Sequence, residues 1–157
     1  MTRPTRIVAL LLALVLQVAL ALGVVAPRLV PRLAGDEYLL RVEPFDPVDP
    51  FRGAYVDLRY QGFEPRRGAA GDTVVYVPLV RDGGAWRGAG AVARRPTRGP
   101  FVACRDAGAR PSCGIESLFL SEEGARRAER ELAGGRALAR VRIDGEGRAA
   151  LLGLETG

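Results

Sequence analysis

Hydrophobic and polar positions divide the chain into an N-terminal apolar run and a longer part in which apolar and polar residues alternate. The run from Ile7 to Ala26 is twenty residues long and contains one polar residue, Gln17, and no charge. At a rise of about 1.5 Å per residue, a helix of this length matches the hydrocarbon core of a bilayer, which is about 30 Å thick. The pattern therefore predicts an N-terminal transmembrane helix.

Alternation with a period of two predicts short β-strands through the rest of the chain. The segments that carry it lie between turns rich in glycine, proline and aspartate. In chain order they are 37–43, 54–60, 73–80, 85–92, 101–104, 115–120, 136–143 and 148–155. Ser121, followed by two glutamates, is typical of a helix start and predicts one short surface helix to Leu132. The expected fold is mainly β, an antiparallel β-sandwich or barrel-like domain with one short surface helix.

The residues around the apolar run set the expected organisation of the chain. The segments are a basic cytoplasmic flank at 1–6, a transmembrane anchor at 7–26, a spacer at 27–35 that leaves the helix at two prolines, and an extracytoplasmic β-domain at 36–157. A cleaved signal peptide is the alternative, with a small-residue cleavage site at Ala21-Leu22-Gly23. Since the apolar region of a signal peptide is usually about 7 to 15 residues long, this longer run favours an uncleaved anchor.

The two cysteines, Cys104 and Cys113, bear on the compartment. Eight residues separate them, and these include Gly108 and Pro111, which let the chain turn back on itself. A disulfide here would add roughly 2 to 3 kcal/mol in the chain-entropy model and would persist only in an oxidising compartment. The expected location is therefore the inner or cytoplasmic membrane, with a single pass and the C-terminal domain outside the cytoplasm. Two unrelated thiols in a reducing compartment remain the alternative.

Composition removes several classes of chemistry. All 23 cationic residues are arginine, set against 18 acidic ones, and the chain has no lysine and no histidine. Without imidazole there is no Ser-His-Asp triad, no Cys-His pair and no ordinary catalytic zinc site, and without lysine there is no Schiff base. The arginines are scattered and form no basic stripe interleaved with aromatic residues, so no nucleic-acid partner is expected. We expect no catalytic residue, no metal and no cofactor.

An acidic proline turn that runs into a strand, from Asp46 to Tyr60, is the most distinctive part of the chain. We expect it to form a surface that contacts a partner, made of Asp46, Asp49, Arg52, Gly53, Tyr55, Asp57, Leu58 and Tyr60. The structural interpretation is that the aspartates cap nearby backbone amides and the tyrosines are half-buried strand residues. A third interpretation is a carboxylate-dependent hydrolase of envelope glycans that uses Asp46, Asp49 or Asp57.

The residues Arg52-Gly-Ala-Tyr-Val-Asp-Leu-Arg-Tyr60, preceded by Pro47-Val-Asp-Pro50, resemble the signature of the GDYXXLXY family of bacterial membrane-anchored proteins. The segment Gly114-Ile-Glu116, with Phe119 and 122–124, resembles the second block of that family, and 145–153 resembles its closing hairpin. Position 54 is alanine where the signature has aspartate, so a role of that carboxylate is missing here. Leu118 and Ser121 also depart from the aromatic residue and the proline expected in the second block.

The resemblance implies an inner-membrane anchor, an external domain and association with a polytopic membrane protein, and it supplies no reaction. The expected function is thus a membrane-tethered extracytoplasmic binding or assembly module that contacts the bilayer and such a partner. Enzymatic activity is not favoured. The alternatives are the glycan hydrolase and a carrier of a small ligand, which would need a deep apolar pocket inside the sheet.

Overall fold

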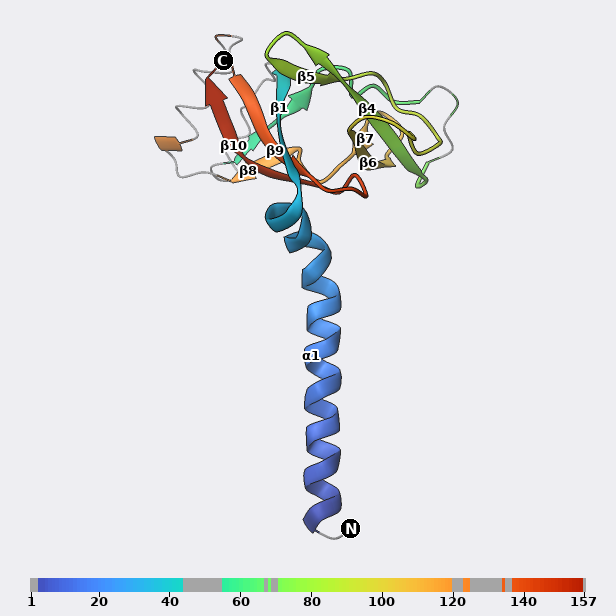
Figure 1. Cartoon of the computed structure of the whole chain (residues 1–157), viewed down its shortest axis with the longest axis vertical. Helices are drawn as coiled ribbons and strands as arrows, with labels where there is room; N and C mark the ends of the chain where they lie inside the picture. Colours follow the sequence, from blue (N-terminus) through green and yellow to red (C-terminus); the bar gives the residue numbers. More distant parts are fainter. Residues whose placement is uncertain are drawn as a thin grey trace.

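The protein consists of a long helix and a β-domain at its C-terminal end (Figure 1). The structure is a computed structural model of the whole chain, and it describes residues 3–43, 55–66, 68, 71–119, 123–124, 134 and 137–156. The helix, α1 (Arg3–Ala34), contains 32 residues. In the part of the chain that is described, no helix is long and apolar enough to cross a membrane, so the transmembrane part of the prediction is not confirmed.

Ten strands form the β-domain in the described residues. They are β1 (Asp36–Glu43), β2 (Tyr55–Asp57), β3 (Arg59–Tyr60), β4 (Val74–Asp82), β5 (Ala85–Gly88), β6 (Phe101–Asp106), β7 (Pro111–Ser112), β8 (Ser117–Phe119), β9 (Ala137–Ile143) and β10 (Ala149–Thr156). The larger sheet has the order β10-β9-β1-β5-β4-β6-β7, with β3 also paired to β1, and β2 and β8 form a separate pair. The mainly β fold is confirmed.

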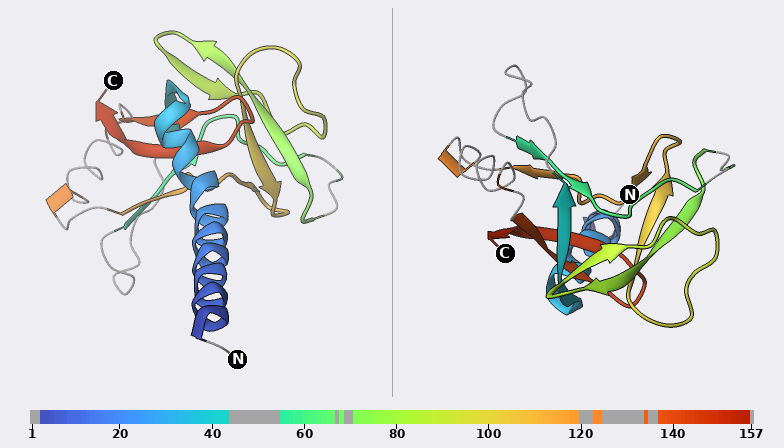
Figure 2. Two further views of the ribbon diagram at one scale, coloured as in Figure 1. Left: turned by 60° about the horizontal axis from the view of Figure 1, so that its bottom comes forward. Right: turned by 90° about the horizontal axis from the view of Figure 1, so that it is seen from above.

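The prediction of an antiparallel domain is wrong in one respect, because the larger sheet is mixed. Strand β1 pairs in parallel with β5, where Leu40 lies opposite Trp86, while its other partners, β9 and β3, are antiparallel to it. The strand order places the hairpin of β9 and β10 on one side of β1 and strands β4 and β6 on the other, and Figure 2 shows the domain in two further views. The sheet curls, since the amide of Ala103 in β6 donates a 2.8 Å hydrogen bond to the carbonyl oxygen of Gly147 in the β9–β10 turn.

The core follows the alternation in the sequence. In β9 every second residue is buried, and in β1 the side chains of Leu40 and Val42 are buried on the face that the pattern predicts. Side chains of β4 and β6 complete the core from the other half of the sheet. The buried residues of β9, β4 and β6 are Ala137, Ala139, Val141, Ile143, Val75, Val77, Leu79, Phe101, Val102, Cys104 and Asp106. Strands β9 and β4 thus each bury one face, as a period of two requires, whereas in β6 the neighbours Phe101 and Val102 are both buried.

The strand expected over 54–60 is divided in two at Leu58. Its backbone amide donates a 2.7 Å hydrogen bond to the carbonyl oxygen of Glu116, and at this point the chain passes from the small sheet to the large one. The strand expected over 85–92 ends at Gly88, and Val92 forms an isolated bridge with Tyr76. Of the surface helix expected over 121–132, only residues 123 and 124 lie in the described part, and they are helical.

Helix α1 continues through the two prolines that were expected to end it. Proline lacks the backbone N–H of the helical ladder, and such a position normally destabilises a helix by about 3 kcal/mol. Pro31 is fully buried, and the last part of α1 contacts β9 and β10, so packing against the sheet offsets that cost. Only Gly35 lies between α1 and β1, and its amide donates a 3.2 Å hydrogen bond to the carbonyl oxygen of Pro31. The expected spacer at 27–35 is therefore helix up to Ala34.

Candidate functional site

The expected partner surface is described only in part. Asp46, Asp49, Arg52 and Gly53 lie outside the described residues, as does the side chain of Tyr55, whose backbone belongs to β2. Asp57 is exposed, and its Oδ1 accepts a 3.4 Å hydrogen bond from the hydroxyl of Ser117. Leu58 and Tyr60 are 3% and 8% exposed, so they belong to the core rather than to an outer surface.

Tyr60 joins two distant parts of the chain. Its hydroxyl donates a 2.7 Å hydrogen bond to the carbonyl oxygen of the fully buried Ile115, and its ring lies 5.2 Å from that of Phe63. Burial raises the pKa of the Tyr60 phenol above its ordinary value, and the charge of Glu116 raises it further. The hydroxyl is therefore a neutral donor at physiological pH. Tyr60 thus connects the signature segment, residues 53–60, to the turn that follows the second cysteine.

That turn, from Cys113 to Glu116, is fixed by its own side chains. The sulfur atoms of Cys104 and Cys113 lie at disulfide distance, 2.06 Å. The carboxylate of Glu116 accepts hydrogen bonds from the amides of Cys113 and Gly114, the latter at 2.9 Å to Oε2. Gly114 has a φ of 78°, a conformation that glycine adopts without strain. Sequence reasoning did not identify this role of Glu116, although the glycine two residues before it is a turn signal.

A cavity of about 350 Å³ lies beside the signature segment. Four parts of the chain line it: the end of β1, the residues from Asp57 to Tyr60, the loop that follows them, and the hairpin between β6 and β7 with the turn beyond it. The lining residues are Glu43, Asp57, Leu58, Arg59, Tyr60, Gly62, Phe63, Glu64, Pro65, Ala109, Arg110, Pro111 and Glu116. This volume is near the lower end of the range of small-molecule sites, about 300 to 1,000 Å³.

The loop wall of the cavity, residues 61–65, is held against the chain that follows β5. Backbone carbonyl oxygens of Gln61, Gly62 and Glu64 accept hydrogen bonds of 2.8, 2.8 and 3.0 Å from amides at the end of β5 and just after it. Gly62 has a φ of 74°, and a Cβ atom there would lie 1.9 Å from the carbonyl oxygen of Gly88. Only two glycines allow this approach of the two backbones. The loop wall is therefore a fixed part of the fold.

The hairpin wall of the cavity, residues 109–111, is held by the disulfide. Strands β6 and β7 pair with Arg105 opposite Ser112 and Asp106 opposite Pro111, and the two cysteines lie one position further along. The disulfide therefore closes the open end of a two-residue ladder. The loop wall is held by backbone hydrogen bonds and the hairpin wall by a covalent bond, so the cavity is present before any ligand binds. Such preorganisation is typical of binding sites.

Six of the lining residues are charged, and their charges are not equivalent. Glu43 and Arg59 lie directly opposite each other in the pairing of β1 with β3, so they offset each other. The carboxylate of Glu116 is occupied by backbone amides. Glu64 on the loop wall and Arg110 on the hairpin wall make no side-chain hydrogen bond or ion pair with any residue that the structure describes. Among the described residues no cluster of acids or cysteines has the arrangement of a metal site.

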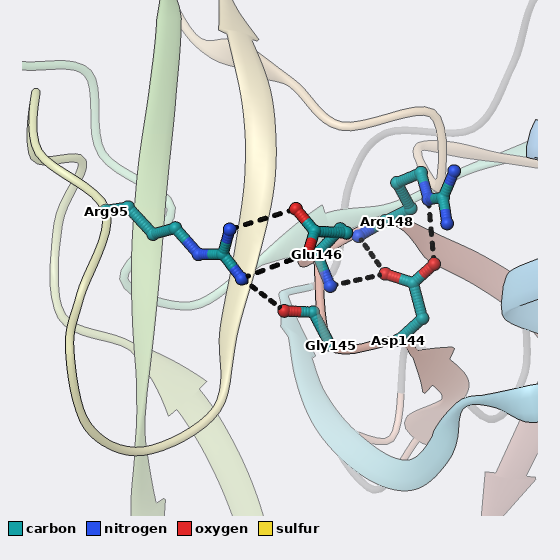
Figure 3. Close-up of polar contacts among 5 residues, drawn as sticks. All are labelled: Arg95, Asp144, Gly145, Glu146 and Arg148. Atoms are coloured by element: carbon teal, nitrogen blue, oxygen red, sulfur yellow. Dashed lines mark hydrogen bonds and ion pairs between the residues drawn. The ribbon is translucent and has the colours of Figure 1, made fainter.

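The closing hairpin is a second polar cluster, and its contacts are structural (Figure 3). Asp144 Oδ1 accepts hydrogen bonds from the amides of Glu146 and Arg148, at 2.9 and 3.0 Å, and its Oδ2 lies 2.7 Å from Nε of Arg148. From the loop after β5, Arg95 binds the Glu146 carboxylate at 2.9 Å and the carbonyl oxygen of Gly145 at 2.7 Å. Every charged group drawn has a partner, so this cluster fixes the turn.

The sequence model of the GDYXXLXY protein family matches residues 17–154. The chain belongs to this family. The match includes the signature segment, both cysteines, the turn at Glu116 and the closing hairpin, and so it covers every residue that lines the cavity. No curated protein and no solved structure matches the chain.

Proposed function

We propose that the protein is a membrane-tethered binding or assembly module whose β-domain lies outside the cytoplasm and acts with a polytopic membrane protein. The observation that carries the proposal is the exposed apolar surface of α1. Thirteen large apolar side chains between Ile7 and Val25 are each 46% to 70% exposed. They occupy all sides of the helix, and a helix that is apolar all round is stable in an apolar environment rather than in water.

The proposed span is the uncharged sequence from Ile7 to Ala26. Its twenty residues correspond to about 30 Å of helix, the thickness of a bilayer core. The cysteine pair supports an orientation with the β-domain outside, because disulfides persist in oxidising compartments and are rare in the cytosol. The location we propose is the inner or cytoplasmic membrane, with a single pass.

Binding is favoured over catalysis by the residues at hand. The chain has neither histidine nor lysine, and the charged groups that line the cavity are carboxylates and guanidiniums. The hydrolase alternative needs two facing carboxylates, and two of its three candidates, Asp46 and Asp49, lie outside the described residues. The carrier alternative called for a deep apolar pocket. The cavity has charged walls, so it does not support that alternative.

Two experiments test the proposal. In the first, alkaline phosphatase fused to the C-terminus is expected to be active, and the full-length protein is expected to resist extraction from membranes by alkaline carbonate. An inactive fusion, or extraction of the whole chain, would contradict the tether and its orientation. A matched variant in which Leu12 and Leu16 are replaced by arginine is expected to release the protein, since each charge at the centre of a span costs about 3 kcal/mol.

The second experiment addresses the partner. A photo-crosslinking residue at Asp57, an exposed position of the signature segment, is expected to capture one discrete membrane protein in native membranes. The same residue at Arg98, exposed in the loop before β6, is the control and is expected to capture none. Equal products at both positions, or no product at Asp57, would count against a partner surface here.

A further inference from the structure

Among the described residues that line the cavity beside the signature segment, Glu64 on the loop wall and Arg110 on the hairpin wall carry opposite charges without an ion pair. Glu64 is the only charged residue of the loop wall, and Arg110 is the only charged residue of the hairpin wall. Both side chains are exposed, and neither makes a hydrogen bond or ion pair within the described part of the chain. The lining also includes Leu58, Tyr60 and Phe63, which are apolar or aromatic.

From this arrangement we propose that the cavity binds a small zwitterion, an amino acid or a short peptide with a free ammonium group and a free carboxylate. Arg110 would bind the carboxylate, since its guanidinium offers a fork of donors that fits two oxygen atoms. Glu64 would accept hydrogen bonds from the ammonium group. Asp57, whose contact with Ser117 is long at 3.4 Å, adds negative charge to the same region.

The mixed charges of the lining favour this ligand over a simple anion or cation. A cation site would leave Arg110 uncompensated, and an anion site would leave Glu64 and Asp57 facing the ligand with like charge. A ligand that carries both charges satisfies both walls. The volume of about 350 Å³ suits a ligand of about the size of a dipeptide.

The rigidity of the two walls is the second support. Three backbone hydrogen bonds hold the loop wall and the disulfide holds the hairpin wall, so the backbone positions that carry Glu64 and Arg110 are fixed before binding. Only the two side chains have to be ordered by the ligand, and binding avoids the entropy cost of ordering a loop. The inference is independent of the membrane tether, because every residue that it uses belongs to the β-domain.

The test is a titration of the ¹⁵N-labelled full chain in mild detergent at low ionic strength, with dialanine as the probe. Three derivatives complete the set: N-acetyl-dialanine lacks the ammonium group, dialanine amide lacks the carboxylate, and N-acetyl-dialanine amide lacks both. Dialanine is expected to shift the amide resonances of Gly62, Glu64 and Arg110. Loss of either charge is expected to weaken binding about three- to tenfold, because the groups are solvent-exposed.

Two variants connect each charge of the ligand to its wall. In Glu64→Gln the advantage of dialanine over N-acetyl-dialanine is expected to shrink, because only Asp57 remains to attract the ammonium group, while the advantage over dialanine amide stays. In Arg110→Gln the advantage over dialanine amide is expected to be lost, while the advantage over N-acetyl-dialanine stays. Glu155→Gln and Arg98→Gln make the same charge changes outside the cavity lining and are expected to bind as the wild type does. The dispersion of the amide spectrum checks that each variant is folded.

Three results would overturn the inference. The first is the absence of shifts in the lining amides at millimolar dialanine. The second is binding of N-acetyl-dialanine amide as tight as that of dialanine, which would show that the cavity does not distinguish charged from uncharged ligands. The third is an equal effect of the control variants, which would show that net charge and not these two residues determines binding.

Discussion

Replacement of Tyr60 by phenylalanine tests the idea that the last tyrosine of the signature has a structural role. The change removes one oxygen atom and keeps the ring, so the contact with Phe63 stays. The lost group is the donor of a buried 2.7 Å hydrogen bond to the carbonyl oxygen of Ile115. That oxygen belongs to a fully buried residue.

The expected magnitude follows from this burial. A buried acceptor that loses its partner costs about 1 to 3 kcal/mol, more than the net value of a typical exposed hydrogen bond. We expect the free energy of unfolding to fall by about 2 kcal/mol. With an m-value of about 1 to 3 kcal/mol/M in urea, the midpoint of unfolding falls by about 1 M.

The assay is urea unfolding of the full chain in mild detergent, followed by the fluorescence of Trp86. This residue is the only tryptophan, and it packs against Tyr38 in the β-domain with ring centroids 5.4 Å apart. Tyr76→Phe is the matched control, because the hydroxyl of Tyr76 makes no hydrogen bond to any residue that the structure describes. Its midpoint is expected to change by less than about 0.5 M.

Equal midpoints for Tyr60→Phe and the wild type, or equal shifts for the two variants, would refute the structural role. The pH dependence gives an independent check. The folded-state pKa of Tyr60 lies above the ordinary value of 10.0, so the folded protein holds this proton more tightly than the unfolded chain. The stability from this group is complete below about pH 10 and falls above it, by up to about 1.4 kcal/mol per pH unit. Tyr60→Phe is expected to lack this part of the decline.

Two further predictions concern the walls of the cavity. Gly62→Ala is expected to prevent folding of the β-domain or to lower its stability by more than about 3 kcal/mol, because the new Cβ would overlap the carbonyl oxygen of Gly88. The control is Gly84→Ala, where nothing lies within 4 Å of the new Cβ. Similar proteolysis rates of the two variants would contradict the reasoning. Removal of the disulfide in Cys104→Ser/Cys113→Ser is expected to cost roughly 2 to 3 kcal/mol in urea unfolding, and a loss below about 0.5 kcal/mol would show that the hairpin wall is held by other contacts.

The strands could be predicted from the sequence because the alternation of apolar and polar residues lies within each strand. In β9 the alternation of Ala139, Val141 and Ile143 with arginines identifies the strand and its buried face without knowledge of any partner. The disulfide was also within reach of sequence reasoning, since a short loop with glycine and proline brings Cys104 and Cys113 together.

The parts that the sequence did not predict depend on contacts between distant residues. The parallel pairing of β1 with β5 places Leu40 opposite Trp86. Nothing in the sequence around either residue indicates whether the neighbouring strand runs parallel or antiparallel. Pro31 was expected to end the helix because its local preference is clear, and the packing that overrides this preference comes from the far end of the chain. The cavity combines four separate segments, so its charge pattern exists only in the folded protein.

The junction at Gly35 has a mechanical consequence. A Cβ at this position would lie 2.9 Å from the backbone of Ile143, and the side chain of Arg142 donates a hydrogen bond to the carbonyl oxygen of Arg32. Helix and sheet are thus joined without a hinge. We therefore expect a rotation or tilt of α1 to move the β-domain with it, so that a protein that binds and turns the helix would also reorient the cavity, far from the point of contact.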